Sequence, residues 1–153
     1  MITVLAAPTL DGAHLMAYWI LKTEPSEYSF ADLRRDKRTR WDGITNAQAL
    51  QYLRAMAAGD ECLIYHSGDE RALVGYAKVM RAAYVADGQP DPRLVSVDIE
   101  AGAALPHPVP LSAIKADGAF SQLGLVRQGR LSVSPVPAPA FERLVAMGSG
   151  PAD

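Results

Sequence analysis

The chain has 153 residues, of which 49% are hydrophobic and 21% are charged. This length and composition predict one folded domain with a substantial core and exclude a largely disordered protein. The formal net charge is −2 and the sequence pI is about 5.9. Proteins that bind duplex DNA without regard to sequence usually carry a basic surface, so overall charge gives no such signal here. If nucleic acid is the partner, local chemistry in a pocket must select it.

A single cysteine, Cys62, excludes an internal disulfide and fits a reducing, cytoplasmic compartment. His14, His66 and His107 lie far apart in the sequence, and no pair of Cys or His residues has the spacing of metal ligands. We therefore expect no metal and no other cofactor.

No apolar run approaches the roughly 18 residues that span a bilayer, so no membrane partner is expected. Residues 1–15 lack the basic start of a signal peptide. We predict that they are a disordered extension or a mis-assigned start. The same reasoning predicts a folded domain over 16–147 and a flexible tail over 148–153.

The first half of the chain predicts one strand and two helices. Residues 18–21 are a short apolar run that predicts a buried strand. Ser29 and Asp32 have the spacing of a capping box, which predicts a helix over 30–36, and 37–40 is expected to be a polar turn. A second helix should start at Thr45–Asn46, continue to residue 56 and end before Gly59.

The second half predicts more strands. Residues 61–67 and 72–84 are strand-like and joined by a hairpin turn, and 94–100 alternates like a half-buried strand. The proline-rich stretch 106–110 is not expected to form a central strand. A short helix over 111–115, a last strand over 130–133 and a helix over 139–147 complete the chain. The sum predicts an α+β fold, a small antiparallel β-barrel with short inserted helices, and not a doubly wound parallel sheet.

Polar and aromatic residues gather where four predicted elements begin or end, at 22–26, 41–46, 65–67 and 130–132. Binding sites are usually assembled at such places. Trp41 is the first candidate for an aromatic wall and Tyr65 the second, although each is also a plausible core residue. Asn46 is equally well explained as a helix cap, and His66 as a hydrogen-bonded core histidine.

Four sequence stretches, in this order and spacing, resemble the signatures of EVE-domain proteins. They are YWILKTEPS at 18–26, WDGITN at 41–46, IYHSG at 64–68 and VRQGRLSV at 126–133. The resemblance covers about residues 17–145. It implies a PUA-like barrel related to YTH domains, with a pocket that reads a modified base, especially a modified cytosine in DNA. Thr45 and Leu50 stand where many members of the family have Arg, which removes two cations from the expected mouth of the pocket.

The resemblance also implies which residues form the base-binding pocket. Carried over onto this sequence, the pocket segments of the family correspond to Lys22, Thr23, Glu24, Pro25, Trp41, Asp42, Asn46, Tyr65, His66, Ser67, Arg130, Leu131 and Ser132. Lys22 and Arg130 would face a phosphate or a base carbonyl. Without the resemblance, both would be read as ordinary exposed cations.

We therefore expect a non-catalytic module that binds nucleic acid carrying a modified base, with DNA favoured over RNA. A base must leave the duplex stack to be read, at a cost of roughly a few kcal/mol. An aromatic side chain can return about 1–3 kcal/mol by stacking, and polar groups must pair with the edge of the base.

Two other functions stay open. The same pocket could serve a small molecule or a protein partner. A hydrolase acting on nucleotides would use His66 with Ser67 or Asp42. However, neighbouring residues on a strand point to opposite faces, and Cys62 has no adjacent cation or base. We therefore expect no catalytic residues.

Overall fold

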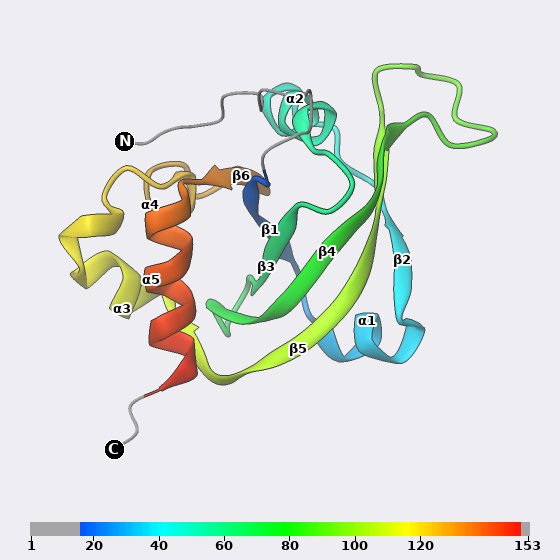
Figure 1. Cartoon of the computed structure of the whole chain (residues 1–153). Coiled ribbons are helices and arrows are strands. Elements are labelled where there is room, and N and C mark those ends of the chain that lie inside the picture. The colour runs from blue at the N-terminus through cyan, green and yellow to red at the C-terminus, as the bar shows by residue number, and fades with distance from the viewer. Residues whose placement is uncertain (1–15, 151–153) are drawn as a thin grey trace.

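The structure is a computed structural model that describes residues 16–150. The predicted N-terminal extension over 1–15 and residues 151–153 of the predicted tail lie outside the described residues. A curved sheet forms the centre of the molecule, with helices on both of its sides (Figure 1). No helix within the described part is long and apolar enough to cross a membrane.

Six strands make one sheet in the order β2-β5-β4-β3-β1-β6. Their bounds are β1 (Tyr18–Thr23), β2 (Arg38–Trp41), β3 (Glu61–His66), β4 (Ala72–Tyr84), β5 (Ser96–Pro110) and β6 (Val133–Val136). The pairing of β1 with β3 is parallel, and the other neighbouring pairs are antiparallel. The parallel pair arises because the chain from β1 to β3 crosses through two helices and β2 instead of a hairpin.

The sheet is not closed into a barrel. β2 and β6 are its two edge strands, and no pairing between them appears among the described residues. The prediction of an α+β fold is confirmed, whereas the prediction of a small β-barrel is wrong because the sheet is open. Its expected antiparallel pairing holds for every neighbouring pair except β1 with β3. The hairpin patterns within 61–100 correctly predict the pairing in the middle of the sheet. They contain no information on whether the two edge strands pair with each other.

The helices cover the two faces of the sheet. They are α1 (Phe30–Asp36), α2 (Ala47–Ala55), α3 (Leu111–Ala116), α4 (Gly124–Arg127) and α5 (Ala138–Ser149), with a 3-10 helix at Gly118–Phe120. The predicted capping box of α1 is present, because Ser29 accepts from the Asp32 N–H while Asp32 accepts from the Ser29 N–H. α5 continues two residues beyond its predicted end.

β2 forms where a polar turn was predicted. Lys37 ends α1 with a φ of 70°, and the chain then pairs at once with β5, Arg38 opposite Glu100 and Trp41 opposite Val97. The last strand also starts later than predicted, at Val133 instead of residue 130. Both errors concern short edge strands, whose alternation is too brief to be read from the sequence.

β5 continues through the proline-rich stretch 106–110 that was not expected to be a central strand. At this end β5 pairs with β4 alone, Pro110 opposite Ala72 and Val109 opposite Leu73, while β2 reaches only as far as Glu100. The stretch is therefore an edge locally. Proline is tolerated in such a local edge because an N–H that would point to the free side has no ladder bond to make.

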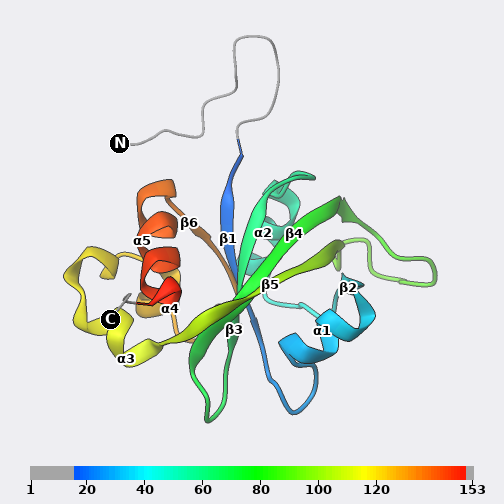
Figure 2. The same ribbon diagram turned by 60° about the horizontal axis from the view of Figure 1, so that its bottom comes forward.

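Alternation along β1 and β3 divides the core into two clusters on opposite faces. One cluster contains Trp19, Leu21 and Ile64 and packs under α1 and α2. The other contains Ile20 and Tyr65 and packs under α3, α4 and α5. Figure 2 shows the corresponding helix groups on the two sides of the sheet.

Candidate functional site

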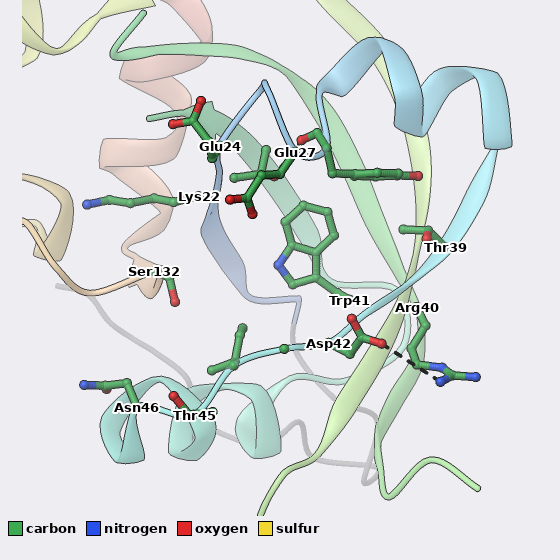
Figure 3. A pocket seen from close by; sticks show the side chains of 14 residues that line it. Lys22, Glu24, Glu27, Thr39, Arg40, Trp41, Asp42, Thr45, Asn46 and Ser132 are labelled. Atoms are coloured by element: carbon green, nitrogen blue, oxygen red, sulfur yellow. Dashed lines mark hydrogen bonds and ion pairs between the residues drawn. The ribbon is translucent and has the colours of Figure 1, made fainter. Parts of the chain in front are cut away.

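A cavity of about 770 Å³ opens where the end of β1, the loop before α1, strand β2 and the start of α2 meet (Figure 3). This volume lies within the roughly 300–1,000 Å³ of typical ligand pockets. The lining residues are Lys22, Thr23, Glu24, Glu27, Tyr28, Thr39, Arg40, Trp41, Asp42, Gly43, Ile44, Thr45, Asn46 and Ser132.

Two aromatic rings form part of the wall. Trp41 ends β2, and its side chain belongs to the core while it borders the cavity, so only 8% of the residue is exposed. Its ring centroid lies 6.3 Å from that of Tyr28, at an interplanar angle of 74°. The Tyr28 hydroxyl donates to Asp36 Oδ2 at 2.8 Å, and burial raises the pKa of this phenol. The two rings are therefore fixed nearly at right angles.

Two polar side chains have hydrogen-bonding capacity to spare. Asn46 Oδ1 accepts from the Ala49 N–H at 2.9 Å and so caps α2, but its amide NH₂ has no partner among residues 16–150. The hydroxyl of Ser132 is likewise unpaired there. By contrast, Thr23 Oγ1 donates to the Tyr28 carbonyl at 2.6 Å and fixes the loop.

The cavity is not electropositive, because the cations Lys22 and Arg40 are outnumbered by Glu24, Glu27 and Asp42. Lys22 Nζ donates to the Gly129 carbonyl at 2.7 Å, and burial lowers the pKa of this lysine. Arg40 lies 3.9 Å from the Asp42 carboxylate. The carboxylate of Glu24 accepts from Ser26, and that of Glu27 is directed into the cavity (Figure 3).

The predicted base-binding residues fall into two groups. Those that line the cavity are Lys22, Thr23, Glu24, Trp41, Asp42, Asn46 and Ser132. Those that do not line it are Pro25, Tyr65, His66, Ser67, Arg130 and Leu131.

The residues of the second group lie outside the cavity for different reasons. Tyr65 packs into the core cluster under α3, α4 and α5, on the sheet face opposite Trp41. Leu131 is buried in the cluster that contains Trp41, Arg130 is exposed and Pro25 lies in a turn. Tyr65 still lies close to one cavity residue, because Lys22 Nζ is 5.6 Å from the centroid of its ring.

His66 has a structural role that accounts for both of its ring nitrogens. Nε2 accepts from the Phe30 N–H at 2.9 Å, so Nδ1 carries the proton that it donates to Glu70 Oε1 at 3.0 Å. The Ser67 hydroxyl donates to the Thr23 carbonyl at 3.3 Å, not to histidine. His66 therefore holds the start of α1 in place and forms no nucleophile–base pair with Ser67 or Asp42.

Cys62 and the arrangement of possible metal ligands bear on the same question of catalytic chemistry. Cys62 is fully buried, and burial raises the pKa of its thiol, which disfavours the reactive thiolate. Within residues 16–150, no three His, Cys, Asp or Glu side chains are grouped to hold a metal ion.

The sequence did not predict seven of the lining residues, which are Glu27, Tyr28, Thr39, Arg40, Gly43, Ile44 and Thr45. The first two belong to the loop that continues the predicted 22–26 segment. Thr39 is two residues from Trp41, so it would have been found by assuming a strand that ends at Trp41.

Comparisons with known proteins identify the family of the chain. The EVE domain family model matches residues 17–147. Thymocyte nuclear protein 1 of Mus musculus is 28% identical over 89% of this chain and 75% of its own length, and that of Gallus gallus is 29% identical over 85% and 68%.

Solved structures share the fold. Rpa0253 from Rhodopseudomonas palustris is 35% identical, with a TM-score of 0.82 over 87% of this chain and 93% of that one. Human THYN1 in complex with 5-methylcytosine-containing DNA is 25% identical, with a TM-score of 0.82 over 89% and 99%. The chain therefore belongs to the EVE domain family.

Proposed function

We propose that this protein is a non-catalytic module that binds DNA carrying a modified cytosine and holds the extruded base in the Trp41 cavity. One observation carries the proposal: a single cavity combines two aromatic rings with polar groups that have no partner within the described chain. Human THYN1 is similar to this chain over 89% of the chain's length, and its structure contains 5-methylcytosine DNA. This similarity supports DNA as the partner.

The aromatic pair suits a flat ligand. A base that stacks on one ring presents its edge to the other, because the rings of Trp41 and Tyr28 are nearly perpendicular. Stacking of about 1–3 kcal/mol per base offsets much of the roughly few kcal/mol needed to unstack it. Ile44, which also lines the cavity, offers an apolar contact for a methyl group, as apolar side chains do for the thymine methyl in DNA.

The polar lining suits cytosine in particular. The exocyclic amine of cytosine is a donor, and a Glu or Asp carboxylate is its usual protein acceptor. The acidic side chains of Glu27 and Asp42 supply such acceptors, whereas the carbonyl O4 of thymine would face them with like polarity. The free NH₂ of Asn46 and the Ser132 hydroxyl can donate to the ring nitrogen and the carbonyl of cytosine.

The test is a titration of fluorescein-labelled duplexes that differ at one central position: cytosine, 5-methylcytosine, 5-hydroxymethylcytosine, thymine or N6-methyladenine. We expect the 5-methylcytosine duplex to bind at least fivefold more tightly than the cytosine duplex. Matched single-stranded DNA and RNA arms separate the three forms of nucleic acid. Equal, weak binding across the panel would overturn the proposal.

Glu27→Gln is the sharpest variant for the same panel, since it keeps the length of the side chain and converts an acceptor into a mixed donor and acceptor. Loss of discrimination between 5-methylcytosine and thymine, with the fold intact, is the expected result. Glu142→Gln on α5, an exposed residue outside the cavity, is the matched control.

A further inference from the structure

The most concentrated positive charge of the chain extends from the end of α1 into β2, the strand that ends at the cavity. Residues 34–40 contain Arg34, Arg35, Lys37, Arg38 and Arg40 against one acid, Asp36. The whole chain has the opposite balance, with 15 Lys and Arg and 17 Asp and Glu. A third of all the cations therefore lie in seven residues that form the end of α1 and most of β2.

Three of these cations have no interaction partner among the described residues. Arg35 is paired with Asp32 and Asp36, and Arg40 lies near Asp42. The side chains of Arg34, Lys37 and Arg38 are exposed and make no hydrogen bond or ion pair among the described residues. Exposed cations that share one short segment and lack partners form a surface ready for an anion.

The segment is close to the cavity. In the edge strand β2, Thr39, Arg40 and Trp41 line the cavity, and the exposed Arg38 directly precedes them. Arg38 lies three strand residues before Trp41, a backbone separation of about 10 Å. That equals the rise of about three base pairs along the DNA helix axis and about one Debye length at 0.1 M salt.

The cavity itself cannot supply this attraction. Its acids outnumber its cations, and Lys22 is held by the Gly129 carbonyl. A nucleotide that enters brings phosphates on both sides of its sugar, so the lining alone would repel the backbone. Positive charge must come from outside the cavity.

We infer that Arg34, Lys37 and Arg38 form a phosphate-binding segment that contacts the DNA backbone beside the nucleotide held in the cavity. The inference rests on the proposed function for the position of the base, but it concerns the sequence-independent part of binding. Phosphate contacts fix the position of a protein on the duplex without reading its sequence. The segment therefore accounts for DNA binding by a chain with a net negative charge.

The experiment measures the salt dependence of affinity for a labelled duplex with one central 5-methylcytosine and for the same duplex unmodified. Each phosphate contact contributes a slope of about −0.9 in log K against log salt, which is about 3.5-fold in affinity between 50 and 200 mM. We expect Arg38→Gln to flatten the slope by about 0.9, and the triple variant R34Q/K37Q/R38Q to flatten it by up to about 2.7. The ratio of affinities for the two duplexes should not change.

Two controls separate this role from general charge. Lys115→Gln removes one cation from α3, which lies on the other side of the molecule from α1 (Figures 1 and 2), and should leave the slope unchanged. Arg38→Lys keeps the charge and should keep the slope. All of the substituted side chains are exposed, and circular dichroism melting checks that each variant is folded.

The outcomes distinguish the two proposals. If the wild type prefers the modified duplex and the triple variant keeps the wild-type slope, the phosphate-binding segment is refuted and the base-reading cavity stands. If the wild type shows no preference but the slope flattens, the segment is supported and the proposed function is refuted. Absence of binding to either duplex refutes both.

Discussion

Replacing Trp41 should separate the stability of the protein from its binding. The side chain is 8% exposed and packs in the core, so Trp41→Ala removes buried contacts as well as a wall of the cavity. Truncation of a buried aromatic residue costs about 3–5 kcal/mol of unfolding free energy. A domain of this size has about 5–15 kcal/mol, so the variant is expected to fold with a reduced margin.

The loss in binding should be smaller than the loss in stability. Stacking on an aromatic ring is worth about 1–3 kcal/mol per base, and the slight exposure of Trp41 favours the lower end. About 1 kcal/mol corresponds to roughly fivefold in affinity. Trp41→Phe keeps an aromatic face and fills much of the same volume, so it should retain most of both quantities.

The assay combines urea denaturation, which gives the unfolding free energy, with anisotropy titration under conditions where each variant is folded. Refutation would come from folded Trp41→Ala that binds the 5-methylcytosine duplex as tightly as the wild type. The indole would then be a core residue alone, and the Tyr28 ring would be the remaining stacking candidate in the cavity.

Three other substitutions test single contacts. Asn46→Asp keeps the α2 cap but replaces the free NH₂ with an acceptor, so affinity for the 5-methylcytosine duplex should fall while the melting temperature is unchanged. Asn46→Ala removes the cap as well and should also lose about 0.5–2 kcal/mol of unfolding free energy. In Gly75→Ala the added Cβ would overlap the ring of Phe30, so chemical denaturation should show a loss of about 1–3 kcal/mol of unfolding free energy. Gly118→Ala, with open space around it, should leave the unfolding free energy unchanged. Asp60→Ala leaves three N–H donors without their acceptor and should destabilise the protein by about 3 kcal/mol, measured in the same way.

Strong local signals in the sequence predicted the regular elements well. Helix α1 was predicted with its observed bounds, because the Ser29–Asp32 capping box and the following apolar residues act within one turn. Strand β4 was likewise predicted in full from a long run of strand-forming residues. Where a segment is long or capped, local preference and tertiary packing agree.

Prediction failed where the deciding contacts are remote in sequence. β2 has four residues and exists because β5, about 60 positions later, pairs with it. Tyr65 was predicted near the aromatic site, but the phase of β3 sends it to the opposite core. A local pattern gives the alternation of a strand, whereas the sheet decides which phase faces the cavity.

The open sheet explains why a cavity exists at this place. Lys22 near the end of β1, together with Ser132 just before the edge strand β6, lines one side, and Thr39 and Trp41 of the other edge strand line the opposite side. Pairing β2 directly with β6 would close a barrel and occupy this space with a backbone ladder. The edges instead remain apart and are joined through one shared core cluster that includes Trp41, Leu131 and Val133. The gap that makes the barrel prediction wrong is therefore the same gap that leaves room for the cavity.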